Sequence, residues 1–304
     1  MQTERTFVDE LKYQYRHGGM HIRLIFLNTI VFLVIRIALM IEQLSGIKTG
    51  AVTDVVNDIF TLQSSLTLFL SKPWGLVTSI FSHFSFMHFL LNMLFLFTSG
   101  RMFLQFFSSR RLLHVYVIGG IMGGIFEVLA HVFFPGLTSQ PLVVGASGSI
   151  MAIFIALAFY RPSLQISLFG VIQLPFMVLA GVFLLSDLVS LGANDNVAHF
   201  AHIGGALIGI LSVQNLHASS NLINWSENVS QRVRGFAGRL LRPKQKLRVE
   251  KGGRGTVKTD EQYNMEAKER QKKIDIILDK ISRSGYESLT KAEKEFLFSQ
   301  SKNG

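Results

Sequence analysis

The chain has 304 residues, of which 49% are hydrophobic and only 16% are charged, and its formal net charge is +10. Soluble domains usually carry about a quarter of charged residues, so this composition excludes an ordinary soluble protein and indicates a polytopic membrane protein. Cysteine is absent, which excludes disulfides and thiolate metal sites. Because Glu4, Asp9 and Glu10 precede the first apolar run, we expect no cleavable signal peptide.

Six apolar stretches approach the length of about 20 residues that a membrane helix needs. They are the ranges 22–41, 84–105, 112–133, 147–160, 172–191 and 199–216. Arg36 interrupts the first, and we expect it to face the bundle or to snorkel outward, because a mid-bilayer arginine costs about 2.5–3.5 kcal/mol on insertion scales. The connection 42–71 is too broken to span and is predicted to be an interfacial loop. The fold class is therefore predicted to be all-α, a polytopic membrane helix bundle with six transmembrane helices and a short cytoplasmic helical tail.

Lysine and arginine alternate between the two ends of these spans. They gather before the first span, between the second and third, after the fourth and after the sixth, whereas the other loops hold only Lys48 and Lys72. By the positive-inside rule, both termini are predicted to be cytoplasmic. The fourth span then begins on the outer side.

The fourth span is short and begins with the motif Gly-Ala-Ser-Gly, residues 145–148. Its 13 residues from Ser147 to Phe159 make a helix of about 20 Å, whereas the hydrocarbon core is about 30 Å thick. If Tyr160 and Arg161 mark the inner interface, Ser147 lies on the order of 10 Å below the outer one. Non-helical backbone at that depth needs protein cover or water, so we expect an outward-opening hydrated cavity with Ser147 at its floor. By itself, the motif is more typical of close helix packing than of a catalytic site.

A histidine on the sixth span could activate this serine. His202, Gly205 and Gly209 share one helical face, and glycines on a membrane helix allow another helix to approach closely. Gly148 and Ala152 offer a matching small face on the fourth span. Their contact would bring the imidazole within the ~3 Å needed to activate a hydroxyl, although a structural, hydrogen-bonded histidine remains the alternative.

The second span supplies further polar groups. His88 and Asn92 are four residues apart and project from one helical face. Together with the Ser147 N–H, they could hold an oxyanion; the alternative is that they join helices by hydrogen bonds. His83 is placed nearer the outer interface.

The histidines of the second and sixth spans also raise the question of a metal site. His199 lies three residues before His202 and is predicted to be structural or to line the cavity. No HExxH pattern occurs, and no carboxylate lies at ligand spacing beside either histidine. We therefore expect no metal and no cofactor.

Three segments together resemble the rhomboid family of intramembrane serine proteases. They are "GASG", "AHIGGALIG" and "HFSFMHFLLN", which occur on the expected spans, and the resemblance covers roughly residues 20–216. It implies that Ser147 is the nucleophile and His202 its general base and acid. His88, Asn92 and the Ser147 N–H would form the oxyanion hole, and Gly145 would let the backbone approach the substrate.

The resemblance also implies a Ser–His dyad without a third carboxylate. Asp187 and Asp195 are placed toward the outer end of the fifth span and its loop, in keeping with that expectation. The implied substrates are single-span membrane proteins, cut in or beside the membrane segment. The implied location is the inner (plasma) membrane of a bacterium, with the active site opening to the outer side.

Two other functions compete with proteolysis. A non-catalytic rhomboid-like scaffold would bind client transmembrane helices, but such proteins typically lose the serine or the histidine. A transporter could use intramembrane histidines, but the sequence lacks the paired broken helices that inverted repeats show.

The predicted organisation has a cytoplasmic segment (1–21), a membrane protease domain (22–218), a basic juxtamembrane helix and linker (219–259) and a small helical hairpin (260–304). A helical stripe after the sixth span comprises Trp225, Val229, Val233, Phe236 and Leu240. Ten lysines and arginines lie between residues 232 and 258, which predicts binding to anionic headgroups of the inner leaflet rather than to nucleic acid.

The hairpin is predicted from two local patterns. An apolar face comprises Ile274, Ile277, Leu278 and Ile281. Thr290 and Glu293 have the spacing of a capping box, which predicts that a second helix begins there.

Overall fold

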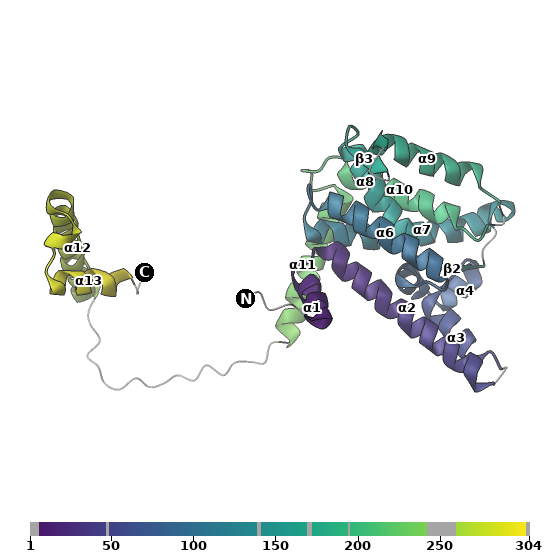
Figure 1. Cartoon of the computed structure of the whole chain (residues 1–304), viewed down its shortest axis with the longest axis horizontal. Helices are drawn as coiled ribbons and strands as arrows, with labels where there is room; N and C mark the ends of the chain where they lie inside the picture. Colours follow the sequence, from purple (N-terminus) through teal and green to yellow (C-terminus); the bar gives the residue numbers. More distant parts are fainter. Residues whose placement is uncertain are drawn as a thin grey trace. The chain divides into compact units, whose positions relative to one another are not determined.

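The computed structural model describes residues 6–46, 49–138, 141–168, 172–193, 195–241 and 260–301 (Figure 1). The chain divides into two compact units, Met1–Leu241 and Arg242–Gly304. The boundary falls inside the predicted basic juxtamembrane segment, and most of the linker, residues 242–259, lies outside the described residues. The finer domain boundaries stay a prediction.

The first unit is built on apolar helices at the predicted places. Among the residues that the structure describes, three helices are long and apolar enough to cross a membrane: α2 (Met20–Ser45), α6 (Phe86–Phe103) and α7 (Ser109–Phe133). Shorter apolar helices follow at α8 (Ser147–Tyr160), α9 (Phe176–Val189) and α10 (His199–Val213). The protein is thus an all-α integral membrane protein with a helical bundle, as the sequence predicts.

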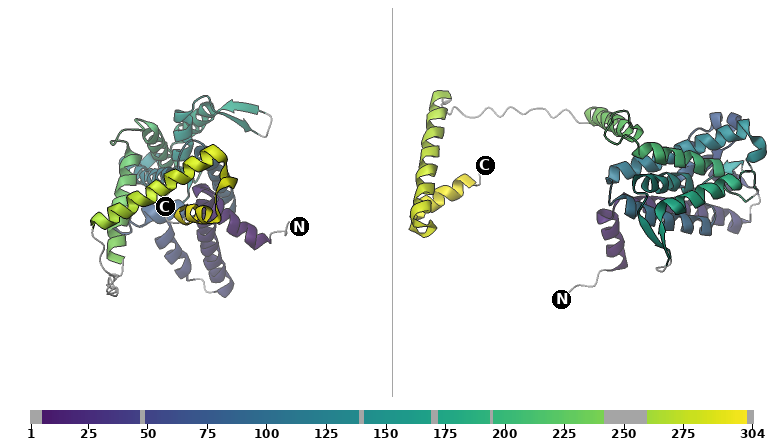
Figure 2. Two further views of the ribbon diagram at one scale, coloured as in Figure 1. Left: turned by 90° about the vertical axis from the view of Figure 1, so that its left-hand side faces the viewer. Right: turned by 90° about the horizontal axis from the view of Figure 1, so that it is seen from above.

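The centre of the bundle is formed by α7, α8 and α10, which pack against one another (Figures 1 and 2). Side chains around the whole circumference of α8 are buried, including Ile153, Ile155 and Leu157. A helix that is apolar on every face suits either a protein core or a lipid environment, and here neighbouring helices bury α8. Ser147 therefore begins the most enclosed helix of the bundle.

The connection 42–71 contains secondary structure where a loop was predicted. It holds α3 (Ala51–Phe60), β1 (Leu62–Gln63) and α4 (Leu66–Ser71), and α5 (Gly75–Thr78) and the 3₁₀ turn η1 (Ser79–Phe81) follow. Strand β1 pairs antiparallel with β2 (Leu142–Val143), just before the Ser147 motif. The backbone polar groups of both segments thereby find partners, which non-helical backbone inside a bundle requires.

The predicted start of the fifth span is wrong by four residues. Residues 172–175 form strand β4 (Ile172–Pro175), which pairs antiparallel with β3 (Gln165–Leu168), and α9 begins only at Phe176. Pro175 explains the difference, because the residue before a proline is driven away from helical dihedrals. The resulting hairpin projects from the bundle (Figure 2).

Helices α1 (Phe7–His17) and α11 (Leu222–Leu241) complete the first unit, together with the 3₁₀ turn η2 (Pro135–Leu137). The predicted stripe after the sixth span indeed lies on a helix, α11. Arg111 joins it to the bundle, because its guanidinium donates to Asn224 Oδ1 at 2.8 Å and to Asn221 Oδ1 at 3.2 Å. Arg36 on α2 donates to the Phe84 carbonyl at 3.2 Å, so its charge has a backbone partner.

The second unit is the predicted hairpin: α12 (Asp260–Ser284), η3 (Tyr286–Ser288) and α13 (Lys291–Ser301). The capping box is confirmed, since the Thr290 N–H donates to Glu293 Oε2 at 2.7 Å and the Glu293 N–H donates to Thr290 Oγ1 at 3.4 Å. Lys280 on α12 also donates to both Glu293 oxygens, at 3.0 and 2.9 Å. Ile277 is buried in this unit, whereas Leu278 of the predicted apolar face is exposed.

Candidate active site

Ser147 is the first residue of α8, at the end of a backbone segment held on both sides. The Gly145 N–H donates to the Ser79 carbonyl at 3.0 Å, and β2 immediately before it is paired with β1. At the first helical position, the Ser147 N–H belongs to the group of amides that have no acceptor within the helix. That amide and the positive end of the helix dipole favour negative charge at this point.

Small residues bring α10 against α8, as expected. A Cβ added at Gly205 would collide with the Gly148 carbonyl oxygen, and one at Gly209 would lie 2.6 Å from the Ala152 carbonyl oxygen. The backbones of the two helices therefore touch, and His202, one turn before Gly205, lies near the start of α8. Glu127 on α7 supports the same end of α10, because its carboxylate accepts the Ala201 N–H at 3.2 Å.

His88 and Asn92 lie on α6, across the cavity from α10. A Cβ added at Gly145 would lie 3.0 Å from His88 Nε2 and 3.8 Å from Ser147 Oγ, so the imidazole and the hydroxyl flank the same glycine. Asn92 Nδ2 donates to the His88 carbonyl at 2.9 Å, which uses one of its two amide hydrogens. The other hydrogen is available to a substrate.

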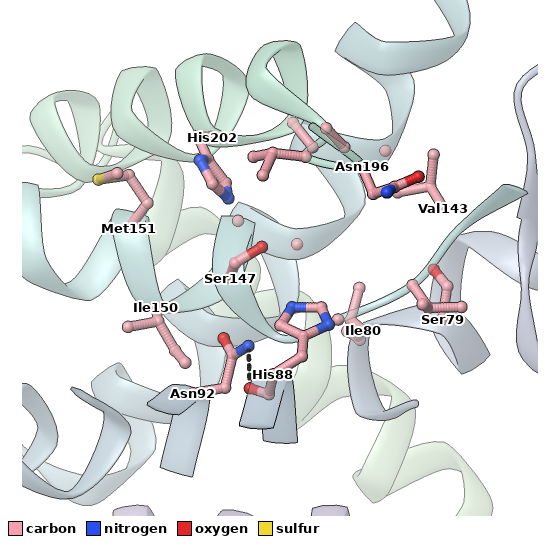
Figure 3. A pocket seen from close by; sticks show the side chains of 18 of the residues that line it. Ser79, Ile80, His88, Asn92, Val143, Ser147, Ile150, Met151, Asn196 and His202 are labelled. Atoms are coloured by element: carbon pink, nitrogen blue, oxygen red, sulfur yellow. Dashed lines mark hydrogen bonds between the residues drawn. The ribbon is translucent and has the colours of Figure 1, made fainter. Parts of the chain in front are cut away.

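These side chains line one cavity of about 690 Å³ (Figure 3). Ser147 lies between His202 on one side and His88 and Asn92 on the other. In the described part of the chain, no hydrogen bond joins Ser147 to His202; such contacts are often loose before a substrate is bound. Apolar side chains of α6, α8 and α9, among them Phe95, Phe154 and Phe183, form another wall.

Asp187 contacts His202, which differs from the expectation of a dyad without a carboxylate. Its Oδ1 lies 2.8 Å from His202 Nδ1 and also 2.8 Å from His199 Nδ1. The last turn of α9 and the first turn of α10 bring the three residues together, although Asp187 lies 12 positions before His199 and 15 before His202. Spacing along the chain did not reveal this contact. One sequence signal could have revealed it: an acidic residue lies near the end of one apolar segment, and a His-x-x-His pair lies at the start of the next.

The two remaining predicted histidines are not among the residues that line the cavity. His199 is buried, and its Nε2 lies 3.1 Å from Asp195 Oδ2, so both of its ring nitrogens face carboxylates. His83 is also fully buried. Its Nε2 accepts the Ala146 N–H at 3.4 Å, and its ring packs against His88 with centroids 5.2 Å apart.

Taken together, the fold and the cavity define a class: polytopic helical membrane proteins with a serine, histidines and an asparagine gathered in a cavity between the helices. Comparisons with known proteins agree with this class. The Rhomboid domain family matches residues 70–218, and a family of unknown function, DUF6576, matches residues 258–303. The chain therefore belongs to the rhomboid family.

Individual relatives match less than half of the chain. RHOMBOID-like protein 12, mitochondrial, of Arabidopsis thaliana is 29% identical over 45% of this chain and 44% of its own length. Presenilin-associated rhomboid-like protein A, mitochondrial, of Danio rerio is 30% identical over 44% of this chain and 35% of its own length. Rhomboid protease GlpG of Haemophilus influenzae is 28% identical over 46% of this chain and 68% of its own length. The chain thus spans less than half the length of the first two relatives.

Proposed function

We propose that this protein is an intramembrane serine endopeptidase. The observation that carries the proposal is the cavity in which Ser147, at the start of α8, lies between His202 on α10 and His88 and Asn92 on α6. Each of these groups has a role in acyl transfer, and they come from helices whose packing holds them in place. The name of the relative from Haemophilus influenzae also describes a protease.

In the proposed reaction, Ser147 Oγ attacks the scissile carbonyl and His202 Nε2 takes the hydroxyl proton. His202 then gives this proton to the leaving amine, and water from the cavity hydrolyses the acyl-enzyme. Asp187 supports this assignment, because a hydrogen bond from His202 Nδ1–H to its carboxylate leaves Nε2 as the basic nitrogen. Asp187 is thus a positioning residue for His202.

Three hydrogen-bond donors would stabilise the oxyanion of the tetrahedral intermediate: the Ser147 N–H, the His88 ring and the Asn92 amide. Removing one donor of such a set typically slows catalysis by about 10²–10³-fold. His83 would support this set from behind by holding Ala146 and the His88 ring.

The proposed substrates are single-span membrane proteins, cut in or beside the membrane segment. The aromatic wall of Phe95, Phe154 and Phe183 suits apolar side chains of such a segment. A substrate helix must unwind to present a peptide bond, which favours residues of low helix propensity near the cut. The proposed location is a bacterial inner membrane with both termini in the cytoplasm, where the basic segment after α10 binds anionic headgroups.

Reconstitution in lipid vesicles with a model single-span substrate tests the proposal. We expect the parent protein to cleave the substrate and to react with a fluorophosphonate probe at Ser147, and we expect Ser147→Ala and His202→Ala to do neither. If the parent does not cleave, or the variants cleave equally well, the protein is not this protease. Binding of the substrate segment without cleavage by the parent would favour the scaffold function instead.

A further inference from the structure

Asp187, His199 and His202, called here the His–Asp cluster, bring three metal-ligating side chains to one point. Asp187 Oδ1 lies 2.8 Å from the Nδ1 atoms of both histidines. One ligand atom from each residue lies within 4.8 Å of the other two. The carboxylate of the cluster comes from Asp187, in the last turn of α9. The prediction that no carboxylate lies at ligand spacing beside these histidines is wrong for Asp195, which lies four residues before His199 and contacts it.

The chemistry of the cluster suits zinc. Two imidazoles and one carboxylate form a common ligand set of Zn²⁺ sites that keep one position open for water. Zinc–ligand bonds of about 2.0–2.2 Å place tetrahedral ligand atoms roughly 3.3 Å apart. The two Asp–His separations need to widen by only about half an ångström to reach that geometry.

A second observation points to the same ligand. Histidines that bind a metal almost always donate their other ring N–H to a carboxylate or carbonyl. His199 has such a partner, because its Nε2 lies 3.1 Å from Asp195 Oδ2. The cluster can also be reached, since Asp187, Asp195 and His202 all line the cavity.

We propose that the His–Asp cluster binds Zn²⁺ and that the bound ion switches the protease off. A metal ion on His202 Nδ1 replaces the hydrogen bond to Asp187 and leaves the ring proton on Nε2. That nitrogen then cannot accept the proton of Ser147 Oγ. The inhibitory consequence rests on the proposed function, whereas the metal site itself does not.

Binding is tested first, in a protein that need not cleave anything. The full-length Ser147→Ala variant, stripped of metal, is titrated with Co²⁺, and the visible absorption of tetrahedral Co²⁺ is followed and then displaced with Zn²⁺. We expect one equivalent to give this spectrum, and His199→Gln in the same background to weaken it by at least about tenfold. Asp195→Asn should weaken binding by about 10–100-fold, as expected for a residue that orients a ligand.

His217→Gln is the matched control, because His217 is an exposed histidine outside the cluster. It should leave the Co²⁺ spectrum unchanged. If His199→Gln leaves the spectrum unchanged, or no tetrahedral spectrum forms, the metal site is refuted whatever the protein cleaves.

Inhibition is tested in the active protein, with each variant compared with its own metal-free rate. We expect Zn²⁺ to stop cleavage by the parent, EDTA to restore it, and His199→Gln to need at least about tenfold more Zn²⁺ for half inhibition. Equal inhibition of parent and His199→Gln would overturn the switch. A parent that binds Co²⁺ at the cluster but never cleaves would instead contradict the proposed function and leave the metal site standing.

Discussion

Asp187 decides which nitrogen of His202 carries the ring proton. With a carboxylate as acceptor, the proton sits on Nδ1 and Nε2 is basic. In Asp187→Asn the amide can donate to Nδ1 and favour the opposite tautomer. We therefore expect kcat to fall on the order of 10²-fold or more with KM little changed, the direction seen for the same exchange in serine-protease triads.

The kinetics of the Asp187→Asn variant should be read beside a spectroscopic measurement. Nitrogen-15 NMR of the His202 ring reports its tautomer, which a purely structural loss would not reverse. Asp195→Asn is the control, since Asp195 contacts His199 and not His202. Unchanged kcat and an unchanged tautomer in Asp187→Asn would show that Asp187 does not position His202.

Gly145 decides how closely His88 approaches Ser147. Its φ is +128°, and a Cβ there would lie 2.8 Å from His88 Cε1. Strain of this kind costs about 1–3 kcal/mol, so we expect Gly145→Ala to lower the free energy of unfolding by about that amount. We expect it also to lower the kcat/KM of the folded protein, because the His88 ring must move away from the new Cβ. Gly136→Ala is matched to it, because nothing lies within 4 Å of a Cβ at Gly136. Equal kcat/KM in the two variants would contradict this view of Gly145.

For single residues, the sequence predicted the side chains that line the cavity, but it did not predict the carboxylate that contacts His202. Ser147, His202, His88 and Asn92 belong to motifs whose helical spacing can be read directly, and all four line the cavity. The contact of Asp187 with His202 depends on how the loop between α9 and α10 turns, which no local spacing specifies.

At the scale of elements, the glycine face of α10 holds His202 beside α8. A Cβ at Gly205 would meet the Gly148 carbonyl oxygen, a backbone atom that cannot move aside without shifting α8. We expect Gly205→Ala to lower the free energy of unfolding in detergent by about 1–3 kcal/mol and to reduce cleavage as well.

Gly181→Ala on α9 is the matched control for the Gly205 exchange. Nothing lies within 4 Å of a Cβ at Gly181, so the same substitution adds no contact there. Its helix should be as stable as before or slightly more so, because glycine inside a helix costs about 0.5–1 kcal/mol relative to alanine. Equal stability of the two variants would show that the α8–α10 contact does not depend on glycine.

The bounds of a helix were predicted well where its apolar run is uninterrupted and clearly ended. Helix α8 lies where it was predicted, because an uninterrupted apolar run follows the serine motif and Arg161 ends it. The start of α9 was missed, because β4 is apolar enough to pass for the first turn of a span and only Pro175 separates the two. The pairing of β1 with β2 joins segments about eighty residues apart, which periodicity cannot reveal.

At the scale of the whole molecule, the chain combines a membrane unit with a small second unit whose two helices share an ion pair. Lys280 and the capping-box groups of Thr290 stabilise the ionised form of Glu293 and lower its pKa to about 2. The carboxylate joins α12 to the start of α13. The apolar core of this unit is small, and its described buried residues are Ile277 and Leu289.

This arrangement predicts that acid loosens the second unit. Because the pKa of Glu293 is lower in the folded unit than its value of about 4.3 in an unfolded chain, the carboxylate stabilises the fold fully above that value. The stabilisation is lost as the pH falls toward about 2.

Hydrogen exchange of peptides from 271–301 in the full chain, corrected for intrinsic rates, should show protection falling over this interval. Glu293→Gln should be less protected at neutral pH and should change less with acid. Glu287→Gln removes only a highly exposed ion pair with Lys294, which contributes little to stability, so this variant should follow the parent. Parallel acid profiles for the parent and Glu293→Gln would contradict this role.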